Sequence, residues 1–196
     1  MKAIIDEKTI YFCIDIEASG PVPALFNMIS IGCTVVKWQA SAQKHILADE
    51  FYYEIKPDFP GFEKETIDIH HLTPEHLAEN GLSSKFVLAE IEKFVKAQTP
   101  PNHKALFVGH NAPFDWMFVA FYFAWAGMKN PFGYNALDTK ALAMGRLEMP
   151  WRYTNKESLY ERFPKLKPTD QPHHALEDAR YQAQILAALL DGKYEP

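Results

Sequence analysis

The stretch YFCIDIEASG, Tyr11–Gly20, begins like a buried β-strand and yet contains two carboxylates, Asp15 and Glu17. Because side chains alternate between the faces of a strand, both acids project from one face, while Ile14 and Ile16 take the other. Burying two neighbouring carboxylates is costly, since each loses its hydration and the like charges repel. A divalent cation between them would remove that cost, and hard oxygen ligands suit Mg²⁺ or Mn²⁺. The alternative is a strand end at which both acids reach water.

The composition is that of a folded globular domain. With 196 residues, 47% of them hydrophobic, the chain fits one domain spanning residues 1–196. The longest apolar run is too short to span a bilayer, and residues 1–10 lack the apolar region of a secretion signal. Cys13 and Cys33 fall in apolar, strand-like segments, which indicates buried thiols in a reducing compartment. We therefore expect a cytoplasmic protein that does not enter a membrane.

Charge is distributed unevenly along the chain. The net charge of −5 provides no overall basic field for a polyanion. Between residues 140 and 167, however, there are seven basic residues and three acidic ones. An acidic body with one basic segment is compatible with a metal site beside a phosphate-binding surface, and equally with a solvated surface loop.

The hydrophobic pattern predicts three consecutive strands followed by alternating helices and strands. Strands are expected at residues 10–16, 28–38, 50–57 and 104–110, helices at 73–81, 83–98, 111–127 and about 174–190, and a short strand running into a helix within 134–144. Thr73 is the expected N-cap of the first helix and Gly81 its stop. Residues 148–172 are polar and predict a loop with a short helix. The expected fold class is α/β: a mixed β-sheet of three antiparallel N-terminal strands with later parallel additions, flanked by helices.

A further acid lies in the segment FVGHNAPFD, Phe107–Asp115. Gly109 permits a sharp turn after a strand, and Asn111 can cap the helix that follows. Asp115 then falls in the first helical turn, where an acid interacts favourably with the helix dipole. The more specific interpretation is that this turn aims Asp115 at the end of the first strand. His110 and Asn111 are expected to form hydrogen bonds of the turn and cap.

The last group of chemically active residues lies in QPHHALEDA, Gln171–Ala179. Asp178 falls inside the final helix among apolar neighbours, whereas Glu177 faces solvent. A histidine and an aspartate near a helix start often form a structural hydrogen bond, so that alternative stays open. A zinc site is not favoured, because Cys13 and Cys33 are not spaced for one.

Taken together, the three motifs resemble those of the DEDDh branch of the DEDD exonucleases, which have an RNase H-like fold. The first motif has the pattern D-x-E-[TS]-x-G, the second G-H-N-x-x-F-D and the third H-x-A-x-x-D-A, and they correspond here to DIEASG at 15–20, GHNAPFD at 109–115 and HHALEDA at 173–179. The resemblance spans residues 12–190, and the LDT at 137–139 is also common in that family. Ala18 departs from the pattern, which usually has threonine there.

The resemblance implies a metal-dependent 3′–5′ exonuclease with two Mg²⁺ or Mn²⁺ ions. The four acids of the family correspond to Asp15, Glu17, Asp115 and Asp178. In the family pattern Asp15 bridges both metals, Glu17 and Asp178 hold the first, and Asp115 holds the second through water. The reaction is hydrolysis of the terminal phosphodiester of DNA or RNA, which releases nucleoside 5′-monophosphates.

The resemblance also implies a histidine general base, for which two adjacent residues are candidates. Helical geometry favours His174, because it lies four residues before Asp178, and residues four apart share one face of a helix. The spacing of the family, five residues before the acid, selects His173 on the loop ahead of the helix. We adopt His173, since histidine titrates close to working pH and can take a proton from the attacking water.

The same resemblance suggests where a single-stranded nucleic acid 3′ end would bind. The backbone of Ala18 and Ser19 is expected to contact the 3′-hydroxyl. One of three apolar residues would wedge against the terminal base: Leu25, Phe26 or Met28, of which we select Phe26. Lys165 and Lys167 in the basic segment are the expected phosphate contacts.

Several relatives of this kind are dimers, so a homodimer is compatible with the sequence. Two other functions stay open. One is a non-catalytic nucleic-acid-binding domain of the same fold. The other is a metal phosphodiesterase acting on dinucleotides or other small substrates, since an acidic protein need not grip a long polymer.

Overall fold

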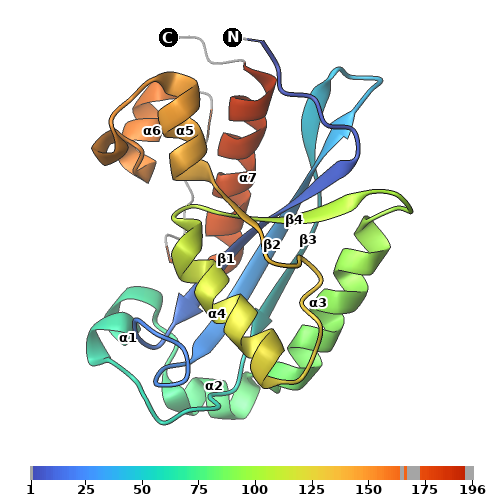
Figure 1. The fold of residues 1–196 in the computed structure, drawn as a ribbon. Coiled ribbons are helices and arrows are strands. Elements are labelled where there is room, and N and C mark those ends of the chain that lie inside the picture. Colours follow the sequence, from blue (N-terminus) through green and yellow to red (C-terminus); the bar gives the residue numbers. More distant parts are fainter. Residues whose placement is uncertain (1, 164–165, 167–172, 193–196) are drawn as a thin grey trace.

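The computed structural model describes residues 2–163, 166 and 173–192, and a five-stranded sheet in the order β3-β2-β1-β4-β5 runs through it (Figure 1). The strands are β1 (Thr9–Ala18), β2 (Met28–Gln39), β3 (Lys44–Glu54), β4 (Lys104–Gly109) and β5 (Ala136–Asp138). β2 pairs antiparallel with both β1 and β3, whereas β4 joins β1, and β5 joins β4, in parallel. The expected mixed sheet, an antiparallel meander with later parallel strands, is confirmed.

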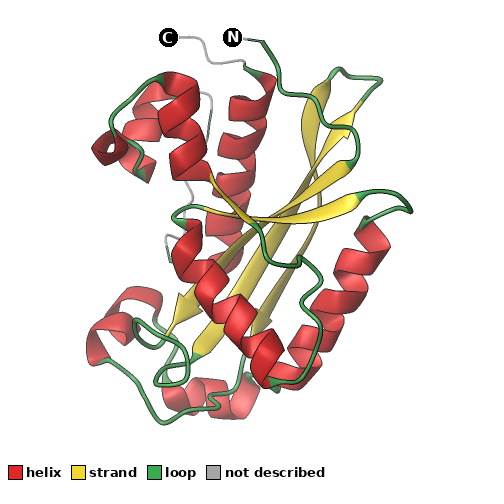
Figure 2. Ribbon diagram, in the orientation of Figure 1, coloured by secondary structure: helices red, strands yellow, loops and turns green. Residues whose placement is uncertain are grey.

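Helices flank this sheet (Figure 2). The three long helices are α3 (Ser84–Gln98), α4 (Ala112–Trp125) and α7 (Ala175–Asp191). The shorter ones are α1 (Lys64–His70), α2 (Pro74–Asn80), α5 (Thr139–Leu147), the 3₁₀ turn η1 (Trp151–Tyr153) and α6 (Lys156–Arg162). The sequence therefore predicted the α/β class and the order of the long elements.

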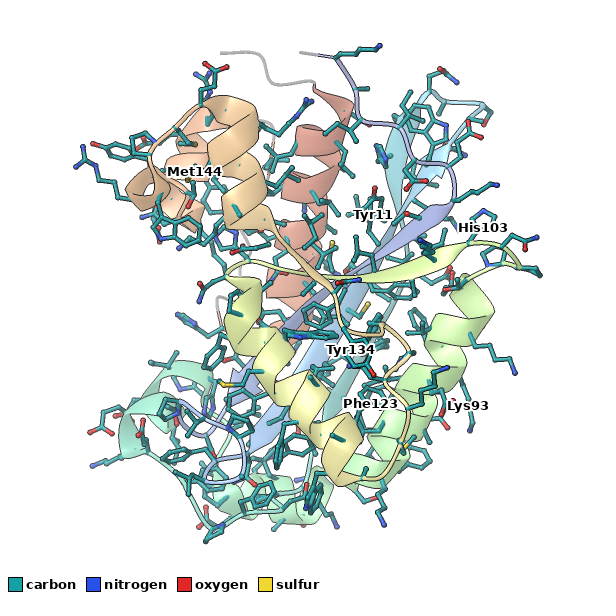
Figure 3. The ribbon with its side chains drawn as sticks, viewed as in Figure 1. Tyr11, Lys93, His103, Phe123, Tyr134 and Met144 are labelled. Atoms are coloured by element: carbon teal, nitrogen blue, oxygen red, sulfur yellow. The ribbon has the colours of Figure 1, made fainter. Side chains whose placement is uncertain are left out.

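The alternation of β1 decides which helix each side chain meets. Ile14 and Ile16 pack with α3 and α4 in one core, which also contains Phe123. Tyr11 and Cys13 belong to a second core, which α7 completes. Figure 3 labels Phe123 and Tyr11, one from each core. Because every second residue of a strand shares a face, the acids that follow Cys13 at steps of two lie on the side of α7.

Local helix signals were only partly reliable. Thr73 caps α2 as expected, because its hydroxyl accepts the backbone N–H of His76 at 3.2 Å, and Gly81 follows the last turn. The side-chain cap expected from Asn111 is wrong: this residue precedes α4 with a left-handed φ of 71° and makes no side-chain cap bond. The helix α1 was not foreseen, because the residue before it, Glu63, provides no side-chain cap either.

Cys13 and Cys33 are both free and buried, in agreement with the expectation from the sequence. Burial raises the pKa of both thiols, so they stay protonated and act as small packing groups. Among the described residues, none of the helices is both long enough and apolar enough to cross a membrane.

Candidate active site

Three carboxylates meet where the end of β1 approaches the start of α7. Asp15 and Glu17 come from β1, and Asp178 comes from the first turn of α7. One carboxylate oxygen from each of these residues lies within 4.8 Å of the others. The fold thus brings together three of the four acids that the sequence singled out, although they lie at opposite ends of the chain.

The helix α7 reaches this position because β2 carries no side chain at Gly32, which pairs with Asp15. A Cβ at Gly32 would lie 2.3 Å from the backbone nitrogen of Leu176, far inside van der Waals contact. Further along α7, Arg180 donates two hydrogen bonds to Glu50 of β3, at 2.8 and 2.6 Å. A close approach and an ion pair therefore hold the helix on the sheet at the level of the acids.

Asp115 reaches the same end of β1 from the first turn of α4. Its Oδ1 accepts a hydrogen bond of 3.1 Å from the backbone N–H of Ile16, the residue between Asp15 and Glu17. Asp115 is buried, and its charge acts on the Asp15 carboxyl. It does not belong to the group of three oxygens within 4.8 Å. The turn after β4 therefore directs Asp115 toward β1, but not into the closest group.

These acids resist ionisation together. Burial, followed by the charges of Asp115, Asp178 and Glu17, raises the pKa of Asp15 well above its ordinary range. Burial and the charge of Asp178 raise the pKa of Glu17 to about 8. Burial also raises the pKa of Asp115 to about 7, against the opposing effect of its bond from Ile16. A cluster of this kind is stable in its charged form only with cations close by.

Two side chains that the sequence analysis did not assign to the site contact these acids. Gln182 of α7 donates a 2.6 Å hydrogen bond to Asp15 Oδ1. Lys156, the first residue of α6, places its Nζ 2.5 Å from Asp178 Oδ1. The sequence held a signal for Gln182, because it lies one turn after Asp178 on the same helix face. It held none for Lys156, whose position depends on how α6 packs against α7.

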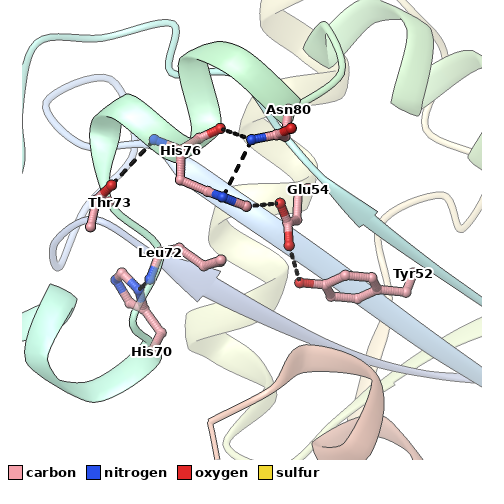
Figure 4. A network of polar contacts seen from close by, with 7 residues as sticks. All are labelled: Tyr52, Glu54, His70, Leu72, Thr73, His76 and Asn80. Carbon is pink, nitrogen blue, oxygen red and sulfur yellow. Dashed lines mark hydrogen bonds and ion pairs between the residues drawn. The ribbon is translucent and has the colours of Figure 1, made fainter.

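The two adjacent histidines have different surroundings. His173 is exposed and has a left-handed φ of 62°, immediately before α7. The ring of His174 stacks on Tyr52, with centroids 4.4 Å apart. The Tyr52 hydroxyl donates to Glu54 at 3.2 Å, and Glu54 also contacts Nε2 of His76 at 2.6 Å, in the network of Figure 4. His174 is thus packed against neighbouring side chains, whereas His173 lies at the surface.

His110 has a structural partner. Its Nδ1 lies 2.9 Å from the hydroxyl of Thr139, which donates in turn to the carbonyl of Gly109 at 3.2 Å. Burial, with the charges of Lys156 and Lys140, lowers the pKa of His110 to about 3. A neutral His110 therefore ties the turn after β4 to the LDT segment at 137–139.

Ser19 is fully buried at the base of the loop that follows β1. Its hydroxyl donates to the Gly61 carbonyl at 2.6 Å and accepts the Asn27 N–H at 2.9 Å, while its own N–H donates to the Asn27 carbonyl at 2.9 Å. The Asn27 side chain also accepts the N–H groups of Asp58 and Phe59, each at 2.8 Å. These bonds fix the loop, and a substrate contact by Ser19 stays a prediction.

The three apolar candidates for the base wedge differ in exposure. Met28 is fully buried in the core and cannot reach a substrate, so including it was wrong. Phe26 is half-buried, and its ring lies so close to Gly20 that a Cβ there would come within 2.2 Å of it. Leu25 is 66% exposed at the tip of the loop. Phe26 therefore supports the loop, and Leu25 is the residue that projects from it.

The remaining expected substrate contacts stay predictions. Ala18 is buried and follows an irregularity of the β1–β2 pairing between Glu17 and Ala18. Such bulges often re-aim the backbone beside an active site. Lys165 and Lys167 lie outside the described residues.

The cluster formed by the carboxylates of Asp15, Glu17 and Asp178 fits a divalent metal centre. Its donors are carboxylate oxygens, which Mg²⁺ and Mn²⁺ prefer, and the three oxygens within 4.8 Å can converge on one ion. Because burial raises the pKa values of these acids, bound cations would also restore their charged form. A centre of this kind is suited to reactions at phosphate groups, where negative charge increases in the transition state.

Comparison with known proteins agrees with this chemistry. The 3′-5′ DNA exonuclease Cap18 of Escherichia coli is 33% identical over 180 residues, which are 91% of this chain and 90% of that protein. The nuclease domain of 3′hExo, a DEDDh family member whose structure was determined bound to rAMP, superimposes with a TM-score of 0.79 over 99% of both chains at 14% identity. E. coli ExoI, solved in complex with ssDNA, matches 95% of this chain with 41% of its own, at a TM-score of 0.73 and 16% identity.

The structural neighbours share the fold of this chain, and one of them is a DEDDh family member, in agreement with the resemblance that the three motifs indicate. Residues 11–190 match the family described as 3′-5′ exoribonuclease Rv2179c-like domain. This match covers the three motifs and all four acids. The protein is thus a 3′–5′ exonuclease, and the chain belongs to the Rv2179c-like family of 3′-5′ exoribonuclease domains.

Proposed function

We propose that the protein hydrolyses the terminal phosphodiester at the 3′ end of single-stranded DNA or RNA and releases nucleoside 5′-monophosphates. The observation that carries this proposal is the convergence of Asp15, Glu17 and Asp178 oxygens within 4.8 Å at the end of β1. Membership in a family of 3′-5′ exonucleases supports the direction of digestion.

Two divalent cations, Mg²⁺ or Mn²⁺, would be held by Asp15, Glu17, Asp178 and Asp115. When bound, such ions stabilise negative charge on the attacking and leaving oxygens of the phosphodiester. The chain already orients two of these ligands, since Gln182 holds one oxygen of Asp15, and the Ile16 N–H holds one oxygen of Asp115. Ligands fixed in this way need little rearrangement when the ions bind.

His173 would act as the general base and take a proton from the attacking water. Its exposure and its place directly before α7, five residues ahead of Asp178, support this role. His174 is less suited, since its ring is stacked on Tyr52. His110 is less suited as well, since its Nδ1 is bonded to Thr139.

The proposed substrate is a single-stranded 3′ end. The relatives support both DNA and RNA as substrates: Cap18 is named a DNA exonuclease, while the family is described as exoribonuclease. The backbone at Ala18 and Ser19 would face the 3′-hydroxyl, and Phe26 would support the neighbouring Leu25 against the last base. Lys165 and Lys167 would contact phosphates of the substrate. The protein would also self-associate as a homodimer, which sedimentation can measure.

The test compares Asp15→Asn with wild type on matched single-stranded DNA and RNA oligonucleotides and on dinucleotides, in Mg²⁺ or Mn²⁺. Asparagine keeps the Oδ1 that accepts from Gln182 but removes the charge, so we expect loss of one-nucleotide products with the fold retained. The matched control is Asp49→Asn at an exposed position of β3. Hydrolysis by Asp15→Asn at near wild-type rate would overturn the assignment. Cleavage by the wild type confined to dinucleotides would replace the polymer substrate with a small one.

A further inference from the structure

Lys156 is held firmly at the edge of the carboxylate cluster. It begins α6, whose first turn is capped by the Asn155 side chain accepting the N–H of Ser158 at 3.0 Å. The buried Tyr181 of α7 donates its hydroxyl to the Lys156 carbonyl at 3.0 Å. Because Tyr181 follows Asp178 by three residues, the same helix positions the acid and the backbone of the lysine.

The ammonium group of Lys156 acts on the whole cluster. Its Nζ lies 2.5 Å from Asp178 Oδ1, and its side chain is 30% exposed. Although burial alone lowers it, the charges of Asp15, Asp178 and Glu17 raise the pKa of Lys156 above its ordinary value. In return, the Lys156 charge lowers the pKa of Asp15, Glu17 and Asp115. One lysine thus offsets part of the repulsion among acids that come from three different elements.

A cation so placed competes with a metal ion. The Asp178 oxygen that faces Lys156 belongs to the carboxyl group that would ligate a divalent ion, and two cations at the same oxygens repel each other. We propose that Lys156 is an internal counter-cation that stabilises the metal-free enzyme and is displaced from Asp178 when divalent metal binds. Lys156 thereby sets the metal concentration at which the site fills. This inference rests on the proposed metal-dependent function.

The first experiment measures Mn²⁺ binding to the full chain by titration calorimetry, together with thermal unfolding in EDTA and in saturating Mn²⁺. In Lys156→Met we expect the dissociation constant for Mn²⁺ to fall about ten-fold, because the competing charge is gone. The unfolding midpoint should fall in EDTA and change much less in Mn²⁺. The matched control is Lys140→Met, which removes a lysine whose Nζ lies over the Trp151 ring at 4.6 Å instead of on the acids; it should leave Mn²⁺ binding unchanged.

A dissociation constant of Lys156→Met within two-fold of wild type, or weaker binding, would overturn the inference. So would an equal loss of unfolding midpoint with and without metal, because a purely structural lysine produces that result. These outcomes differ from failure of the proposed function, in which the wild type itself would bind no Mn²⁺.

A second measurement uses the wild type and does not depend on the variant folding. Lysines are acetylated briefly with and without Mg²⁺, and the modified sites are quantified by mass spectrometry. Displacement from Asp178 predicts a several-fold increase in Lys156 acetylation on adding Mg²⁺, with Lys140 as the internal reference. Equal acetylation of Lys156 in both conditions would show that the lysine keeps its ion pair, and the inference would be wrong.

Discussion

Substituting Gly32 with alanine tests whether the contact between β2 and α7 positions Asp178, one of the proposed metal ligands. The new Cβ would lie 2.3 Å from the Leu176 nitrogen and 2.5 Å from the Ala175 carbonyl oxygen, whereas ordinary contact begins at 3.4 Å. Both neighbours are backbone atoms and cannot rotate away. The start of α7 must therefore retreat by about 1 Å, and Asp178, in the same turn, must move with it.

This retreat of α7 affects both stability and rate. Overpacking of this kind costs about 1–3 kcal/mol of unfolding free energy. A displacement of about 1 Å at a catalytic group can reduce the rate about 100-fold. We therefore expect Gly32→Ala to remain folded, to bind Mn²⁺ more weakly and to lose most of its kcat on a single-stranded oligonucleotide.

Urea unfolding, Mn²⁺ titration and single-turnover digestion measure these three quantities. The control is Gly145→Ala in α5, where a Cβ meets no atom within 4 Å and alanine is expected to stabilise the helix by about 0.5–1 kcal/mol. Wild-type stability and rate in Gly32→Ala would refute the reasoning. Lost stability with an unchanged kcat would show instead that this contact does not determine the position of Asp178.

Two further predictions concern titration and the base. The raised pKa values of Glu17, about 8 against an ordinary 4.5, and of Asp115, about 7 against 3.8, mean that the metal-free folded protein binds more protons than the unfolded chain. In EDTA, its unfolding free energy should therefore fall as pH rises from about 4 to 8, and a flat profile would contradict this prediction. Saturating Mn²⁺ should remove the fall in unfolding free energy. His173→Ala should lower kcat strongly with Mn²⁺ affinity kept, whereas His174→Ala should mainly lower stability by removing the stack on Tyr52. The reverse pattern in kcat would make His174 the base.

Local chemistry explains which elements could be predicted. Thr73 and Gly81 could be predicted as the start and the stop of α2, because cap hydrogen bonds join residues only three or four positions apart. The helix α1 was not predicted, since it is only seven residues long and the residue before it makes no side-chain cap bond. Asn111 has the residue type of a cap, yet its left-handed backbone prevents the cap bond. The residue type alone does not fix the backbone conformation that capping requires.

The sequence by itself determined the mixed sheet, the family and the residues at the four acidic positions, because alternation along a strand and motif spacing are local properties of the chain. Only the tertiary structure decided how those residues meet. Gly32 admits α7 to the sheet, Gln182 binds Asp15, and Lys156 reaches Asp178 from a separate helix. Each of these contacts joins segments far apart in the chain, and their geometry follows from how whole elements pack, a property that no short stretch of sequence encodes.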